Sequence, residues 1–395
     1  MRLYSVIIVV VYGGQAFPQA DDHLLAKASN VLGLNILRDL SAGRPNINVF
    51  FSPASISAAL GMVYAGARGA SEAELLDVIG LKVAGLTDRG SVLSEYRKQL
   101  NDTPTGSVTL EVANAALVSN ELRVLEEYKR ELINTFGAEF RSADFARGGS
   151  EVASEMNRWV SQKTHGKIPQ VFGAGLPLNT MMLLLNAFYF KGSWLTEFSP
   201  KNTVAAPFYN RGTDVVEKST VKMRSKLRHA GLADLDAAAA ELPYKGGRFS
   251  MVIVLPNAKT GLAKLREGLS VGKLEEIDGL LKLKTVNLAF PKFKLEQEYN
   301  LVPTLRRLGL LSVFGDGADL SGVTGDTGLL VSDVKHKAMV EVNEEGTVAA
   351  AVTAARSRLK SLPRIANFLV DRPFMFYIRD KVTRRILFLG EVHAL

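Results

Sequence analysis

Apolar positions along the chain predict helices mainly in the first half and strands mainly in the second. Leu24 to Leu40 has apolar residues at helical spacing, and weaker helical patterns cover residues 92–100, 125–136 and 151–163. Strand patterns cover residues 108–118, 181–190, 249–255, 285–293, 328–342, 374–378 and 386–392. This order favours an α+β fold with large mixed sheets over alternating βαβ units. No linker or repeat divides the chain, so we expect one large domain.

Local signals sharpen three of these elements. Ser52-Pro53 pairs a capping residue with proline at the first helical position, so a helix is predicted to start there. Ser71 and Glu74 have the spacing of a capping box before another helix. The run 182–185 is apolar on both faces, which is typical of a central strand covered on both sides.

The first residues are predicted to be a secretory signal peptide, residues 1–16. Arg2 supplies the positive end, Leu3 to Tyr12 is an apolar run, and Gly14 and Ala16 form a small-x-small cleavage site. The apolar run is much shorter than the ~20 residues that a membrane span needs. We therefore expect a secreted, extracellular protein whose folded part covers residues 17–395, with no membrane partner.

Composition excludes several classes of function. The 395 residues include no cysteine and five histidines, which excludes disulfides and a thiolate metal site and leaves little room for a histidine-based one. The net charge of +8 is spread thinly, so nucleic acid is not indicated as a partner. Asn101 opens an Asn-Asp-Thr sequon in a polar segment, where a secreted protein can carry a glycan.

Signals of enzyme activity are weak. Gly268 to Gly272 matches the G-x-S-x-G pattern around Ser270, but that motif needs a buried strand before the serine. The preceding residues are helix-like, so a junction between two helices is the expected structure. With no phosphate loop, metal motif or complete dinucleotide fingerprint, we expect no catalytic residue, no metal and no cofactor.

One segment has an unusual composition. After the acidic pair Glu344-Glu345 and Gly346, nine residues are drawn only from Thr, Val and Ala, beginning with Thr347. At strand periodicity one face carries only threonine and alanine, although an alanine-rich helix is the alternative. Three basic residues follow, Arg356, Arg358 and Lys360. This arrangement favours a segment that a protease cuts and that afterwards inserts between strands.

Several motifs resemble those of the serpin family, the inhibitors that trap serine proteases. The similarity extends from about Leu24 to Leu395. It rests on seven segments of the chain: 48–56, 66–67, 186–194, 317–323, 336–338, 344–351 and 372–374 with the strand after it. The hinge and the basic end also resemble those of secreted arthropod serpins, including tick salivary ones. The resemblance implies about nine helices, three β-sheets and an exposed reactive-centre loop at about 344–363.

The family resemblance also assigns roles to individual residues. The hinge would comprise Glu344, Glu345, Gly346, Thr347, Val348, Ala349, Ala350 and Ala351. The shutter, a polar cluster beneath strands that must part, would comprise Ser52, Ser55, Asn186 and His336, although all four could be ordinary core hydrogen-bonding residues. The breach, where insertion starts, would comprise Trp194, Lys292 and Glu344.

Counting from Thr347 in the manner of inhibitory relatives places the reactive bond at Lys360-Ser361. A basic residue there suits trypsin-like proteases, whose specificity pocket ends in an aspartate. Arg358 and Arg356 are alternative cleavage positions. We therefore expect a monomeric inhibitor that forms a covalent complex with such proteases, the alternative being a non-inhibitory serpin with a carrier or storage role.

Four basic residues also alternate along one predicted strand, which puts Lys222, Arg224, Lys226 and Arg228 on the same face. This face could be an exosite or could bind a sulfated glycosaminoglycan. A solvated edge strand whose charges oppose aggregation is the other interpretation.

Overall fold

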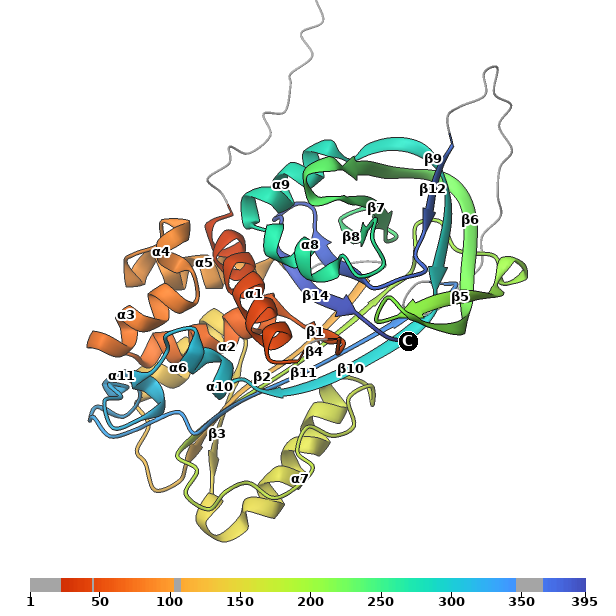
Figure 1. Cartoon of the computed structure of the whole chain (residues 1–395). Helices are drawn as coiled ribbons and strands as arrows, with labels where there is room; N and C mark the ends of the chain where they lie inside the picture. Colours follow the sequence, from red (N-terminus) through yellow and green to blue (C-terminus); the bar gives the residue numbers. More distant parts are fainter. Residues whose placement is uncertain (1–22, 45, 103–107, 346–364) are drawn as a thin grey trace, which may run out of the picture.

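The computed structural model describes residues 23–44, 46–102, 108–345 and 365–395, which form helices packed around two sheets (Figure 1). The α-helices of these residues are α1 Leu24–Ala42, α2 Pro53–Gly66, α3 Gly69–Val78, α4 Leu81–Ala84, α5 Arg89–Asn101, α6 Glu126–Phe136, α7 Phe145–Lys163, α8 Leu262–Gly268, α9 Val271–Leu280, α10 Val302–Arg307 and α11 Ser321–Thr324. Short 3₁₀ turns cover Pro200–Asn202, Ala233–Leu235 and Ser312–Phe314.

The strands are β1 Val49–Phe51, β2 Val108–Ser119, β3 Glu139–Ala143, β4 Met182–Gly192, β5 Val204–Asn210, β6 Asp214–Leu232, β7 Ala237–Pro243, β8 Phe249–Pro256, β9 Lys282–Pro291, β10 Phe293–Asn300, β11 Asp333–Val342, β12 Ala366–Leu369, β13 Phe374–Asp380 and β14 Ile386–Val392. The predicted α+β class is therefore confirmed.

A five-stranded sheet forms the centre of the molecule, in the order β10-β11-β4-β2-β3. Its middle strand β4 carries the apolar run 182–185, and all four of these residues are buried, as expected for a strand covered on both faces. The neighbours β4 and β11 run parallel and pair directly, from Leu183 opposite Asp333 to Tyr189 opposite Met339. Nothing lies between the two strands over this stretch.

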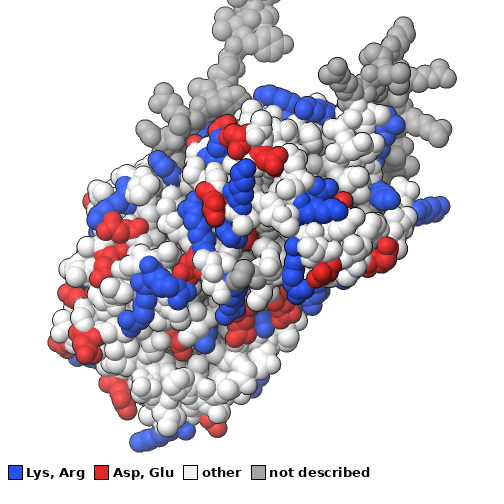
Figure 2. All heavy atoms as spheres, viewed as in Figure 1, with Lys and Arg blue, Asp and Glu red and all other residues white. Residues whose placement is uncertain are grey.

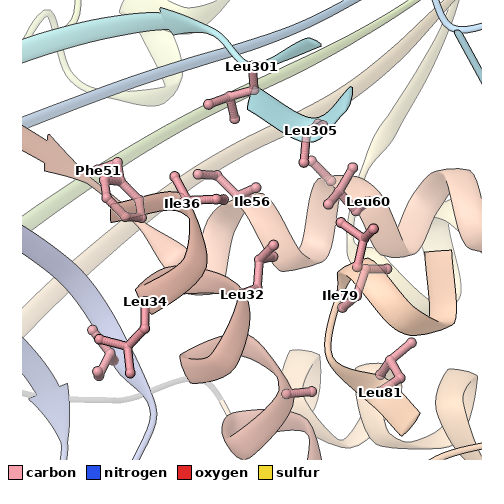
Figure 3. Packing of buried hydrophobic residues seen from close by; sticks show 14 of the residues in the cluster. Leu32, Leu34, Ile36, Phe51, Ile56, Leu60, Ile79, Leu81, Leu301 and Leu305 are labelled. Carbon is pink, nitrogen blue, oxygen red and sulfur yellow. The ribbon is translucent and has the colours of Figure 1, made fainter. Parts of the chain in front are cut away.

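Alternate residues of the central sheet face different helices. Met182 and Leu184 pack in the core cluster that contains α1 and α2, whereas Leu183 and Leu185 pack with α7 on the opposite face. Figure 1 shows α7 along one face of the sheet, away from α1 and α2. Figure 3 shows the first core at close range, where Leu32 and Ile36 of α1 point toward Ile56 of α2. These two layers fix the position of the sheet.

The remaining strands form one hydrogen-bonded network of nine rather than two separate sheets. The reason is β6, which at 19 residues is long enough to pair with β5, β9 and β7 in succession. The family resemblance implied three sheets and about nine helices, whereas the described residues show two networks and eleven α-helices, several of them single turns.

Local predictions had mixed outcomes. Ser52 caps α2 by accepting the Ser55 backbone N–H, with Pro53 at the first helical position, as predicted. The capping box at Ser71 and Glu74 is wrong, because α3 starts three residues earlier, at Gly69 with Arg68 as its N-cap. The Ser71 hydroxyl instead accepts the Asp319 N–H, and Glu74 accepts the N–H groups of 311 and 312. Both side chains therefore make tertiary contacts with the segment 311–319 instead of capping α3.

The predicted strand at 285–293 is also divided. The strand β9 ends at Pro291 and β10 begins at Phe293, so Lys292 lies at the junction between the two sheets.

No helix of the described residues is both long and apolar enough to cross a membrane.

Candidate functional site

The four residues predicted as a shutter lie together under the central sheet. Asn186 of β4 and His336 of β11 are opposite each other in the parallel register, and Ser52 and Ser55 come from the start of α2. All four are buried. The Ser52 backbone N–H donates to His336 Nε2 at 3.0 Å, and the Ser55 hydroxyl donates to Asn186 Oδ1. The structure therefore joins α2 to both strands through side-chain hydrogen bonds.

The protonation state of His336 follows from these partners. Because Nε2 accepts from Ser52, the ring proton lies on Nδ1, which donates to Asn186 Oδ1 at 3.1 Å. Burial lowers the pKa of His336 to about 3, since a charged imidazole would lose its hydration there. The cluster is therefore neutral, and all its contacts are hydrogen bonds.

Sequence reasoning missed a fifth member of the cluster. Asn114 of β2 lies opposite Asn186 in the antiparallel register, and its Oδ1 accepts from Asn186 Nδ2 at 2.5 Å. On the far side, Tyr299 of β10 lies opposite His336, and its hydroxyl accepts the Phe50 N–H at 3.3 Å. We call Tyr299, His336, Asn186 and Asn114 the polar row. Asn114 is the one polar residue within 112–118, and this was the signal that the sequence offered for it.

The predicted breach residues meet at one end of the same two strands. Beyond Tyr189 and Met339 the pairing of β4 with β11 stops, although both strands continue for three residues. There the Trp194 indole N–H donates to the Asn343 carbonyl at 3.1 Å, and the Trp194 backbone N–H donates to the Glu345 carbonyl at 3.0 Å. The chain that follows β11 is thus held against the segment that follows β4.

An ion pair completes this end of the sheet. Lys292 Nζ lies 2.9 Å from Glu344 Oε2, and the Thr203 hydroxyl donates to Glu344 Oε1 at 2.8 Å. Burial tends to raise the pKa of Glu344, but the hydrogen bonds from Lys292 and Thr203 outweigh it and hold that pKa below its ordinary value. The Lys292 side chain is 34% exposed, so water screens this pair more than the polar row.

The rest of the predicted loop lies outside the described residues. This applies to the hinge from Gly346 to Ala351, to the reactive bond Lys360-Ser361 with its alternatives Arg356 and Arg358, and to the signal peptide. The described residues stop at Glu345, beside the open end of β4 and β11, and start again at Ile365, just before β12. Asn101 is exposed as the last residue of α5, but its sequon partner Thr103 is not described.

The predicted basic face is smaller than expected. Lys222, Arg224 and Lys226 are exposed on β6, but Arg228 pairs with Glu241 at 2.7 Å and Asp278 at 3.0 Å, which neutralises it. Over residues 221–227 β6 pairs with β9 on one side, whereas β5 and β7 pair with β6 only before and after this stretch, so the edge-strand interpretation stays open. Figure 2 shows acidic and basic side chains interspersed over the visible face, without a large field of one sign.

The enzyme signals remain unsupported in the described part of the chain. Ser270 lies between α8 and α9 and caps α9 by accepting the Lys273 N–H at 3.1 Å, so the G-x-S-x-G match is a junction between helices, as predicted. Among the described residues, no three His, Asp or Glu side chains cluster in a way that could hold a metal ion.

Known proteins resemble this chain in sequence. A family model described as Serpin (serine protease inhibitor) matches residues 27–395. Iripin-8 of Ixodes ricinus is 42% identical over 383 residues, which cover 95% of this chain and 94% of that protein. Leukocyte elastase inhibitor of Sus scrofa is 37% identical and covers 94% of this chain and 99% of its own length.

Solved structures give the same picture. Human thyroxine-binding globulin in complex with thyroxine has a TM-score of 0.87 at 28% identity, covering 95% of this chain and 99% of its own. Serpin48 of the insect Tenebrio molitor has a TM-score of 0.82 at 30% identity and also covers 95% and 99%. The similarity therefore spans nearly the whole chain in sequence and in fold.

Proposed function

Because this chain belongs to the serpin family, we propose that it is a secreted inhibitor of trypsin-like serine proteases. The family predicted from the motifs is confirmed, and a relative named as an elastase inhibitor shows that the similarity includes protease inhibitors. The choice of protease, the secretion and the mechanism are the proposed part.

The proposal rests on one observation, which is that β4 and β11 are paired along only part of their length. The two strands are parallel, directly paired at their centre and unpaired at the end where Glu345 leads into the small-residue segment. A strand that enters from this end would run antiparallel to both β4 and β11 and would gain ladder hydrogen bonds along its length. From Thr347 to Lys360 is thirteen steps, about 43 Å at ~3.3 Å per residue, which is long enough to fill the sheet.

The proposed reaction starts as ordinary proteolysis. The protease serine attacks the Lys360 carbonyl, the bond to Ser361 breaks with its nitrogen leaving as a free amine, and the acyl group stays on the serine. The freed segment from Thr347 then inserts between β4 and β11 and carries the protease with it. Trapping requires that insertion be faster than hydrolysis of the acyl bond, which small hinge side chains favour.

The direct test is incubation with trypsin followed by a denaturing gel. The wild-type protein is expected to give a covalent complex with trypsin, whereas Lys360→Ala should lose that complex because the specificity pocket no longer receives a cation. Arg358→Ala is the matched control, which should still form the complex. If Lys360→Ala kept near wild-type inhibition while Arg358→Ala lost it, the reactive bond would be at Arg358.

A second variant tests insertion rather than recognition. Thr347→Arg should still be cut but should release the protease, because an unpaired guanidinium would have to pass under the sheet. Each 1.4 kcal/mol on the insertion barrier slows that step about tenfold. Thr347→Ser, which keeps a small side chain, is the control. An unchanged ratio of complex to cleaved protein in Thr347→Arg would remove the hinge assignment.

The same gel separates the second candidate function. A non-inhibitory serpin with a carrier or storage role would give only cleaved protein in every variant. The solved structure of thyroxine-binding globulin with bound thyroxine is an example of a protein with this fold that binds a small molecule. The run of small residues after Gly346 favours inhibition, since a carrier does not need a hinge that can be buried.

Three further parts of the proposal concern the surface. We propose that residues 1–16 are removed on secretion, that residues 17–395 form the folded domain, and that Asn101 carries a glycan at the exposed end of α5. A sulfated glycosaminoglycan would contact Lys222, Arg224 and Lys226, without Arg228, whose charge Glu241 and Asp278 already balance. Binding to immobilised heparin, with and without Lys226→Gln, tests the last point.

A further inference from the structure

The exposed cations of β6 belong to a surface that extends over three neighbouring strands. In the strand order β6-β9-β12, Arg224 lies opposite Asn287 of β9, which lies opposite Asn367 of β12. Asn287 Nδ2 donates to Asn367 Oδ1 at 3.0 Å on the exposed side of the sheet. Lys222 and Lys226 lie on the same side as Arg224, two residues before and after it. The name cationic face is used below for Lys222, Arg224, Lys226, Asn287 and Asn367.

The core holds these strands from the other side. Their inward side chains are buried in one hydrophobic cluster, namely Val221, Leu227, Val286, Leu288 and Phe368. The cationic side chains therefore project from a packed sheet, on the side away from the core.

The positive charge on this face is not balanced by neighbouring acids. Opposite Lys222 and Lys226 in the register of β9 lie Ala289 and Thr285, which carry no charge. Arg228 continues the row but is neutralised by its two ion pairs. The described residues provide the three exposed cations with no ion pair. Three such charges within about 13 Å, at ~3.3 Å per residue, attract an acidic partner.

The cationic face adjoins the strand that follows the proposed reactive bond. β12 begins at Ala366, six residues after Lys360, which is at most about 20 Å at ~3.3 Å per residue. β6 lies two strand spacings from β12, about 10 Å. Figure 1 shows β6, β9 and β12 at one end of the molecule, away from α6 and α7. A globular protease of about 220 residues is about 40 Å across, so one bound at Lys360 is wide enough to reach this face.

We propose that the cationic face is an exosite for the protease, and that it favours proteases with an acidic surface beside the active site. This role rests on the inhibition proposed above, because a protease bound to the reactive segment lies beside β12. Charges at the rim of an interface act mainly on the association rate, and steering can raise that rate by about 10- to 1,000-fold. Lys360 would set which bond is cut, and the cationic face would set which protease of that specificity is inhibited fastest.

Two other roles of the same charges predict different outcomes. A sulfated glycosaminoglycan would contact the same three cations, so on this proposal it would compete with the protease. Charges that only protect the edge of β6 from aggregation would do so with either sign. Exposed Leu369 lies opposite Ala289 in the row of Lys222, and Asn287 and Asn367 are neutral. This mixture of charged, polar and apolar groups is typical of interfaces between proteins.

The test uses the full-length protein with anionic and cationic trypsin, two probes that share the specificity for basic residues and differ in surface charge. At about 0.15 M salt, inhibition of anionic trypsin should be roughly tenfold faster, and this ratio of rate constants should approach one in about 1 M salt. The triple variant Lys222→Gln, Arg224→Gln, Lys226→Gln should lower the ratio about fivefold or more. An unchanged ratio would overturn the proposal.

A matched control separates the cationic face from net charge. Arg130→Gln, Arg147→Gln and Arg158→Gln together remove three exposed cations from α6 and α7. At about 0.15 M salt the screening length is about 8 Å, so this variant should keep the wild-type ratio. An equal fall in both triple variants would assign the preference to net charge and contradict the exosite.

Charge reversal and heparin test the two other roles. Arg224→Glu keeps a charged edge, but it should slow inhibition of anionic trypsin and speed inhibition of cationic trypsin. Equal rates in Arg224→Glu and wild type would favour edge protection and contradict the proposal. Heparin should slow the inhibition of anionic trypsin. Acceleration by heparin that requires the three cations would assign the face to the glycan and overturn the exosite.

Anionic trypsin with its catalytic serine replaced by alanine separates this proposal from the proposed inhibition, because it binds without being trapped. Its dissociation constant for the triple variant of the cationic face should be about fivefold higher than for wild type. If that difference holds but active trypsin forms no covalent complex, the exosite stands and the inhibition is wrong. If the complex forms and both proteins bind equally, the inhibition stands and the exosite is wrong.

Discussion

The centre and the open end of the β4–β11 contact are held by different kinds of interaction. At the centre, Asn186 and His336 are buried, neutral and hydrogen-bonded to α2 and β2. At the open end the strands no longer pair, and the contacts are a partly exposed ion pair between Lys292 and Glu344 and backbone bonds to Trp194. The same two strands are therefore firmly joined in one place and weakly joined in another.

This difference indicates a direction for opening the sheet. Separating the centre would leave several buried polar groups without partners, each at a cost of about 1–3 kcal/mol. Separating the open end removes a screened ion pair that contributes about 1 kcal/mol or less. An added strand would therefore enter beside Trp194 and reach the polar row only after the open end has separated. Four predictions test this contrast, from the largest expected effect to the smallest.

Cleavage of the loop should raise the melting temperature by roughly 20 °C. If the cut segment fills the gap, roughly ten new ladder hydrogen bonds at about 1 kcal/mol each would stabilise the sheet. A chain of this size gains about 2 °C per kcal/mol. The measurement is differential scanning calorimetry of the intact and the cleaved protein. A cleaved protein that melts at or below the intact one would show that the open end does not accept a strand.

Within the polar row, Asn186→Ala should lower the free energy of unfolding by about 3 kcal/mol. The substitution leaves Ser55, His336 and Asn114 each without a partner in a buried site. Asn114→Ala removes only one of these bonds and should cost about 1 kcal/mol. Urea unfolding of the two variants gives the comparison. Equal losses would mean that Asn186 is not the centre of the network.

Acidification should weaken the centre but not the open end over the range from pH 7 to pH 5. The folded-state pKa of His336, about 3, lies below the unfolded value of 6.5, so the unfolded chain takes up the proton first. The stability contributed by neutral His336 is complete above pH 6.5 and falls as the pH drops toward 3. At pH 5 the loss is about 2 kcal/mol, at 1.36 kcal/mol per pH unit below 6.5.

The measurement is urea unfolding at pH 7 and pH 5 for wild type and His336→Gln. The variant should lack most of the acid-induced loss, and the difference between the two proteins removes the contribution of His229, whose pKa burial also lowers. An identical loss in both proteins would contradict the neutral state of His336.

The smallest effect is expected at the open end. Lys292→Met should lower the free energy of unfolding by about 1 kcal/mol or less, because the pair is partly exposed. The loss should shrink in 1 M salt, where the screening length is about 3 Å. The Asn186→Ala loss should stay constant under the same conditions. A salt-independent loss of several kcal/mol for Lys292→Met would erase the contrast between the two regions.

Sequence patterns predicted the structure most reliably where the role of a residue depends only on its neighbours along the chain. Ser52-Pro53 starts α2 as predicted, the run 182–185 is the central strand, and Ser270 lies between two helices. Sequence patterns failed where a side chain has more than one partner to choose from. Ser71 and Glu74 contact the 311–319 segment instead of capping α3, because those partners come from far along the chain.

The sequence by itself determined the family, the fold class and the order of small and basic residues in the segment 344–363, because these depend on side-chain type and spacing. Only the tertiary structure decided which polar residues meet. Register placed Asn114 beside Asn186, and the break between β9 and β10 placed Lys292 beside Glu344. Such pairings join residues more than fifty positions apart, and spacing along one strand or helix carries no information about them.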